Sequence, residues 1–210
     1  MTLVRLPVSP AAAILLILVT PVVARAQGLL DGVYAIDQAA STVSFTLQGS
    51  ALFKVKRDGY FKNFSGLVSY NPARPADTRV DLTVAADSIY MRNSEHAELL
   101  KSAEFFDVER FPTLHFASES TNIQPDGMLS VTGDMTIRGV TRRMTIPVKL
   151  RTTSNGPGQG TAFESTFQID RTEFGINGVP DWHGFHVSIA KKVQIHIAIA
   201  TQPTASQLLR

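Results

Sequence analysis

The chain has 210 residues, of which 44% are apolar and 18% charged, a composition that suits one domain with a sizeable core. It has no cysteine, which excludes thiol catalysis, iron–sulfur clusters, cysteine–zinc sites and disulfides. The formal charge of +2 comes from Arg5 and Arg25, and the rest of the chain holds 18 basic and 18 acidic residues, so charge gives no argument for nucleic-acid binding.

The first 26 residues have the pattern of a signal peptide. Arg5 is followed by an uninterrupted apolar run at residues 11–19, and Ala24-Arg25-Ala26 fits the small-x-small cleavage rule. We predict cleavage after Ala26 and export of the remaining chain. A membrane anchor is the alternative, but the run is shorter than the roughly 20 apolar residues that span a bilayer.

Alternating apolar and polar residues dominate after residue 33, as in the run that contains Val43, Phe45 and Leu47. Similar runs follow at residues 80–84, 113–118, 129–137, 144–150, 163–169 and 193–199, separated by turn signals such as Arg138-Gly139. The pattern predicts an all-β domain over residues 27–200: a single antiparallel barrel of about eight strands, which closes because closure removes exposed edges. The polar tail, residues 201–210, is expected to fray.

One short helix interrupts the strands, between residues 93 and 102. Asn93 or Ser94 caps its start, and Leu99 and Leu100 form a narrow apolar strip. A helix of this kind is expected to cover one end of the barrel. It either plugs a solid, dry core or gates a ligand cavity, and periodicity does not separate these two readings.

All twelve phenylalanines lie after the signal peptide, several of them at strand ends near one mouth of the barrel. Aromatic rings suit a wide apolar pocket, although they would also fill a large barrel interior. The residues predicted to line a pocket are Phe45, Phe64, Val84, Leu99, Leu100, Phe105, Phe106, Phe116, Phe163, Phe167 and Trp182.

Histidines at two places in the sequence are candidates for metal binding or catalysis. The loop 181–186 holds His183 and His186 at H-x-x-H spacing, but no H-E-x-x-H helix surrounds them, so packing is favoured over metal binding and no metal site is predicted. His96 lies on the helix with Arg92 and Lys101 nearby. It is a solvated residue, a polar contact to the head group of a bound ligand together with Arg92, or a catalytic base.

No nucleophile, oxyanion motif or carboxylate pair accompanies His96, so no catalytic residue is predicted. The alternative function is an enzyme that acts on a hydrophobic substrate through His96 or through the loop 181–186, which begins at Asp181. Three further cations, Arg138, Arg142 and Arg143, flank a hairpin turn. A solvated turn is favoured there, and contact with anionic phospholipid stays open.

Four segments in order resemble the YceI-like family. They are GYFKNFSG at 59–66, SEHAELLKSAEFFDVERFPTLHF at 94–116, MTIRGVTRRMTIP at 135–147 and DRTEFGI at 170–176. The opening strand pair around residues 34–45 is also similar, so the resemblance covers roughly residues 33–200. One departure is Ala39-Ala40-Ser41, where many relatives carry a histidine before the serine.

The resemblance implies a lipocalin-like barrel in the bacterial periplasm that binds or transports a long isoprenoid or similar lipid. Polyprenol, polyprenyl phosphate and quinone are the candidate ligands, and stress responses are a linked role. We therefore predict no cofactor other than such a lipid. The missing catalytic groups predict no enzymatic activity, and the balanced charge predicts no nucleic-acid partner. Transient membrane contact and homodimer formation stay open.

Overall fold

The computed structural model describes residues 32–49, 56–151, 161–178 and 189–204. The expected signal peptide, Trp182 and the loop 181–186 lie outside these residues. Within them, no helix has the length and apolar character that crossing a membrane would require. The elements in chain order are β1 (Gly32–Ile36), η1 (Gln38–Ala40), β2 (Thr42–Gln48), β3 (Lys56–Phe61), β4 (Phe64–Tyr70), η2 (Pro75–Asp77), β5 (Arg79–Ala85), η3 (Ala86–Ser88), β6 (Ile89–Met91), α1 (Ser94–Lys101), β7 (Thr113–Ile123), β8 (Leu129–Ile137), β9 (Val140–Arg151), β10 (Ala162–Asp170), η4 (Arg171–Phe174) and β11 (Lys192–Pro203).

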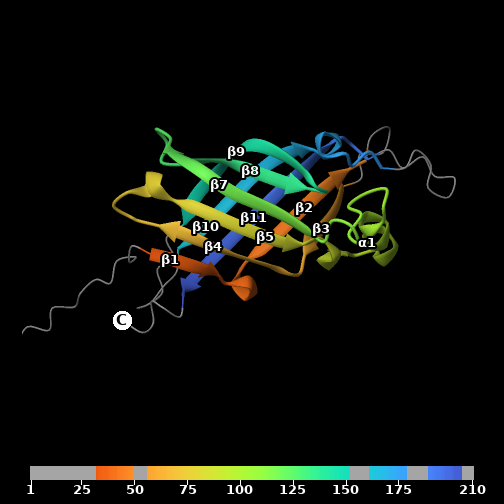
Figure 1. Ribbon diagram of the computed structural model, residues 1–210, viewed down its shortest axis with the longest axis horizontal. Helices are drawn as coiled ribbons and strands as arrows, with labels where there is room; N and C mark the ends of the chain where they lie inside the picture. The colour runs from red at the N-terminus through yellow and green to blue at the C-terminus, as the bar shows by residue number, and fades with distance from the viewer. Residues whose placement is uncertain (1–31, 50–55, 152–160, 179–188, 205–210) are drawn as a thin grey trace, which may run out of the picture.

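Eight antiparallel strands form a closed ring in the order β1-β4-β5-β7-β8-β9-β10-β11. The ring closes because β1 pairs with both β4 and β11. Three further strands, β2, β3 and β6, continue the sheet from β11 toward the end at which α1 lies (Figure 1). The prediction of an all-β, eight-stranded antiparallel barrel with one short helix is therefore confirmed.

The three extra strands arise where a short 3-10 helix interrupts the chain. The strand after each interruption pairs with a different strand from the one before it. After β1 the side chain of Asp37 accepts hydrogen bonds from the amides of Ala39 and Ala40, which stabilises η1. Beyond this turn β2 pairs with β3, whereas β1 pairs with β4. The helix η3 separates β5 from β6 in the same way. The barrel is thereby extended at its helix end.

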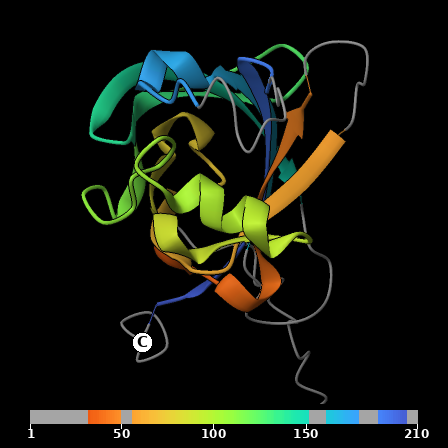
Figure 2. The same ribbon diagram turned by 90° about the vertical axis from the view of Figure 1, so that its right-hand side faces the viewer.

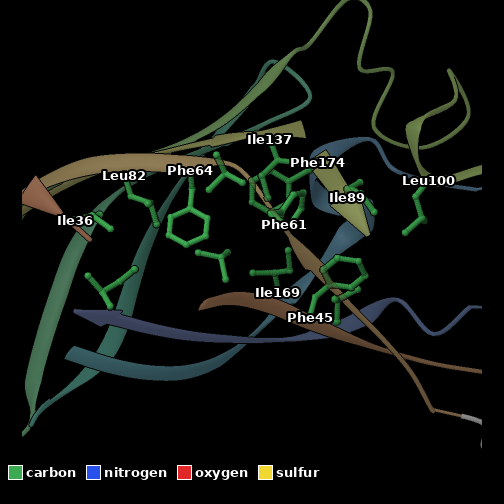
Figure 3. Close-up of a cluster of buried hydrophobic side chains, with 14 of the residues drawn as sticks. Ile36, Phe45, Phe61, Phe64, Leu82, Ile89, Leu100, Ile137, Ile169 and Phe174 are labelled. Atoms are coloured by element: carbon green, nitrogen blue, oxygen red, sulfur yellow. The ribbon is translucent and has the colours of Figure 1, made fainter. Parts of the chain in front are cut away.

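The core runs along the barrel axis, because alternate residues of every strand point inward. Figure 3 shows buried side chains from Ile36 and Leu82, through Phe61 and Ile169, to Leu100, which belongs to α1. A smaller cluster of Phe116, Leu129, Val131 and Ile146 adjoins it. Burial of this apolar surface is the main stabilising term in a chain without cysteine.

Two strands extend past their predicted ends. β7 was expected to end at residue 118 but continues to Ile123, where the buried hydroxyl of Thr121 donates a 2.8 Å hydrogen bond to the carbonyl of Thr78. β11 continues to Pro203, so the prediction that the tail frays from residue 201 is wrong at its start. Thr201 is buried and donates to the carbonyl of Thr161. Hydrogen bonds make both polar residues compatible with burial.

Candidate ligand-binding site

Within the part of the chain that the structure describes, four cavities lie in a row inside the barrel. From the helix end we name them the mouth cavity (about 40 Å³), the upper cavity (about 70 Å³), the middle cavity (about 60 Å³) and the floor cavity (about 60 Å³). The mouth cavity is lined by Leu47, Gln48, Gly49, Arg57, Met91, His96, Leu99, Leu100 and Ile189. The walls of the other three are almost entirely aliphatic and aromatic. The interior can therefore accept apolar groups over much of its length.

Neighbouring cavities share side chains in their walls. Leu47 and Leu100 line both the mouth and the upper cavity, and Phe61 lines both the upper and the middle cavity. Leu82 and Ile197 lie between the middle and the floor cavity. Side chains, which rotate, are thus what separates the four spaces. A flexible apolar chain could occupy all four once these side chains moved aside.

The far end of the barrel is closed by aromatic and hydroxyl side chains. The rings of Tyr70 and Phe163 meet edge to face, with centroids 5.7 Å apart. Burial raises the pKa of the Tyr70 hydroxyl, as expected for an end that excludes water. Tyr34 and Thr78 are also buried there. Passage of a ligand is therefore expected at the helix end.

The helix α1 lies across that open end (Figure 2). Asn93 is its cap, since its side-chain oxygen accepts a 2.9 Å hydrogen bond from the amide of Glu95. Leu100 is buried and points into the barrel (Figure 3), and Leu99 is half-buried in the wall of the mouth cavity. The cavities beneath the helix argue against a plug over a solid core and favour a cover over a ligand space.

Arg138 ties the segment after the helix to the rest of the rim. It lies in the β8–β9 turn and donates to the carbonyls of Gly175 (2.6 Å) and Ala103 (2.7 Å). The β8–β9 turn, the segment after α1 and the end of η4 therefore meet at the guanidinium of Arg138. Arg143, which the sequence grouped with Arg138, instead pairs with Glu119 on the outer surface. The two arginines thus have different environments despite their proximity in sequence.

Arg171 lines the upper cavity and is held by backbone carbonyls. Its Nε donates to Ala190 (3.2 Å), one terminal nitrogen to Ile176 (2.5 Å) and the other to Ile189 (2.9 Å). Burial lowers the pKa of this guanidinium, and the charge of Asp170 partly opposes the effect. All three nitrogens serve structure, joining η4 to the start of β11.

Asp170 orders η4 and should make stability depend on pH. Its carboxylate accepts hydrogen bonds from the hydroxyl and the amide of Thr172, which lower its pKa below the ordinary Asp value. A lowered folded-state pKa stabilises the protein above the unfolded pKa, near 4, and this contribution is lost as pH falls through the folded value. We expect Asp170→Asn to lower the free energy of unfolding at pH 7, and this deficit to be smaller at pH 3, which lies below the unfolded pKa. Urea unfolding at the two pH values measures this, and an equal deficit at both would contradict it.

Most of the predicted pocket residues that the structure describes lie in the cavity walls. Leu99 and Leu100 line the mouth cavity, and the remaining wall residues among them are Phe45, Phe105 and Phe106 (upper), Val84 and Phe167 (middle) and Phe116 and Phe163 (floor). Phe64 is buried in the core but lines none of the four cavities. Trp182 lies outside the described residues. Contact of any of them with a ligand stays a prediction.

The two predicted head-group residues are placed differently. His96 lines the mouth cavity, whereas Arg92 is exposed and lines none of the four cavities. Arg57, which was not among the predicted site residues, also lines the mouth. The alternation in KRDGYF places Arg57 on the same face as Gly59 and Phe61, and this signal was available in the sequence. In the described residues no group of three or more histidines and carboxylates could hold a metal ion.

Comparisons with known proteins give one consistent family. The family model described as the YceI-like domain matches residues 34–201. A UPF0312 protein of Pseudomonas putida is 32% identical over 126 residues, which is 57% of this chain and 64% of that relative, a little under two thirds of its length.

Solved structures share the architecture. BcnA of Burkholderia cenocepacia matches with a TM-score of 0.68 and 25% identity over 79% of this chain and 98% of that protein. A polyisoprenoid binding domain from Saccharophagus degradans, implicated in plant cell wall breakdown, matches with a TM-score of 0.64 over 81% of this chain and 98% of that domain. Its identity is 12%, so this second likeness concerns the fold alone.

Proposed function

The chain belongs to the YceI-like domain family, and from this premise we propose that it binds one long isoprenoid lipid inside the barrel, such as a polyprenol, a polyprenyl phosphate or a quinone. The observation that carries the proposal is the row of four apolar cavities from the helix to the closed end. An isoprenoid is apolar and flexible along its length, as such a row requires. The polyisoprenoid-binding relative supports the same reading.

Apolar burial alone would give useful affinity. Removing apolar surface from water contributes about 25 cal/mol per Å², or about 0.8 kcal/mol for each buried CH₂ group. Several isoprene units would therefore supply more favourable free energy than the ordering of the lipid costs. Specificity then needs only a few polar groups at the mouth, where Gln48, Arg57 and His96 lie.

The proposed role is binding and transport in the periplasm without catalysis. The signal-peptide pattern of residues 1–26 supports export. The family and the polyisoprenoid-binding relative favour a carrier over an enzyme. A lipid held inside a barrel is shielded from water along its length, which is what a carrier between two membranes requires.

Native mass spectrometry of gently purified protein tests the proposal. We expect a co-purifying long-chain lipid at one molecule per protein, or uptake of added polyprenol or quinone by lipid-free protein. Protein that is purified without lipid and takes up neither compound would overturn the proposal. Extraction and fragmentation of the bound lipid identify its chain length.

Variants of the helix and of the segment that follows it test the site. We expect Leu99→Asp and Phe106→Asp to weaken retention of the lipid about fivefold, because each places a charge in an apolar cavity wall. Arg143→Ala is the control, since Arg143 pairs with Glu119 on the outer surface. Retention is measured as the rate of lipid transfer to acceptor vesicles. Equal rates in the three variants would count against the helix as a cover.

A further inference from the structure

Arg57 points into the mouth of the barrel. In β3 its neighbours Lys56 and Asp58 are exposed, whereas Arg57 is half-buried and Gly59 and Phe61 are buried. Its partner across the strands is Leu47, which lines the mouth and upper cavities. The guanidinium therefore lies on the inward face, at the end where the row of cavities begins.

The interior of β3 is shaped so that an aromatic ring lies directly below this arginine. A Cβ atom on Gly59 would come within 2.4 Å of the ring of Phe45, so only glycine leaves room for that ring. Phe45 lines the upper cavity. From the mouth inward, a charged residue is thus followed directly by apolar surface. An amphiphile with a charged head and an apolar tail has its groups in the same order.

The other charged or titratable side chains in the cavity walls have partners, which the structure identifies for three of them. Glu164 of the floor cavity pairs with Arg151, and His115 of the middle cavity pairs with Asp81. Arg171 of the upper cavity donates to three carbonyls. For Arg57 the described residues provide no ion pair within 4.0 Å; its neighbour Asp58 faces outward and accepts a hydrogen bond from Thr46. Among the described residues, this inward positive charge is therefore available to a ligand.

We propose that Arg57 binds the anionic head group of the lipid, a phosphate or a carboxylate, so that the protein prefers acidic isoprenoid lipids to neutral alcohols and quinones. The inference rests on the proposed function and names the class of head group. A guanidinium presents a planar fork of N–H donors that matches two oxygens of a phosphate or carboxylate. Apolar walls beside it strengthen this attraction, because the local dielectric is lower than that of water.

Matched pairs of lipids test the inference. Wild-type protein is titrated with a polyprenol and with the polyprenyl phosphate of the same chain length, and the two dissociation constants are compared. We expect the phosphate to bind at least about tenfold more tightly, a difference of about 1.4 kcal/mol. A long-chain fatty acid and its alcohol form the second pair. A preference in both pairs indicates recognition of either anion, and a preference in the first pair alone indicates phosphate.

Substitutions of Arg57 test whether this residue causes the preference for the anionic lipid. We expect Arg57→Gln to remove the preference while leaving the affinity for polyprenol within about twofold, and Arg57→Lys to keep part of it. Arg143→Gln, which removes an exposed cation that pairs with Glu119 on the outer surface, is the control and should leave the preference unchanged. Equal binding of the alcohol and the phosphate by the wild type would overturn the inference, as would a preference that survives Arg57→Gln. Failure of every lipid to bind would instead overturn the proposed function.

Discussion

Gly66→Ala is expected to lower the free energy of unfolding by about 3 kcal/mol, the upper part of the range for overpacked interiors. A Cβ atom at this position of β4 would lie 2.1 Å from the carbonyl oxygen of Asp81 on the paired strand β5. It would also lie 2.9 Å from the side chain of Ile36. A backbone carbonyl in a paired strand cannot rotate away as a side chain can, so the two strands must separate.

Gly127→Ala is the control for the same chemical change. Gly127 lies in the β7–β8 turn with φ +80°, and no atom lies within 4 Å of its added Cβ. Its cost is limited to the left-handed backbone conformation, roughly 1–2 kcal/mol. Urea unfolding followed by circular dichroism compares the two variants. A deficit for Gly66→Ala no larger than that for Gly127→Ala would show that β4 and β5 adjust more easily than their register implies.

The barrel could be predicted from the sequence because alternation reports which face of a strand is buried. Val43 and Phe45 of β2, like Leu82 and Val84 of β5, alternate with polar residues and do point inward. The start and end of α1 also followed from local chemistry, since Asn93 supplies the cap and Lys101 lies in the last turn. These features depend on residues close together in the chain, which is why a single sequence predicts them.

The features that were missed depend on contacts between distant residues. Thr121 and Thr201 are buried because Thr78 and Thr161, about 40 residues away, supply carbonyl acceptors. The sheet is extended by β2, β3 and β6 because the chain changes its pairing at η1: β1 pairs with β4, whereas β2 pairs with β3. No local sequence pattern predicts this change. When the hydrogen-bond partner of a buried polar residue is distant in the chain, the sequence alone suggests that the strand ends at that residue.

The site was predictable in its apolar part and less so in its polar part. Phenylalanine on an inward face must lie in the core or in a cavity wall, so Phe45 and Phe163 required only the correct face. Arg92 and Arg57 are both basic and both near the helix, but Arg92 is exposed between β6 and α1, whereas Arg57 lies on the inward face of β3. The helix drew attention to Arg92, whereas the alternation in β3 places Arg57 at the mouth.

Ile197→Phe is expected to change which chain lengths bind. Ile197 of β11 is half-buried and, with Leu82, forms the boundary between the middle and the floor cavity. A phenylalanine there would narrow the passage and occupy part of both spaces. A long prenol, of about eight isoprene units, should then bind at least tenfold more weakly, since two lost CH₂ contacts already amount to about 1.6 kcal/mol.

A short prenol, of about three isoprene units, should bind as it does to the wild type, because it needs only the cavities nearer the mouth. Space of about 60 Å³ on each side should keep the loss in stability below about 1 kcal/mol, less than overpacking a solid core costs. Ile123→Phe is the matched control, since Ile123 is 52% exposed and lines none of the four cavities. Titration of both prenols into the two variants gives the comparison. If Ile197→Phe weakened both prenols equally, or neither, the four cavities would not act as one continuous site, and chain length would have to be limited elsewhere.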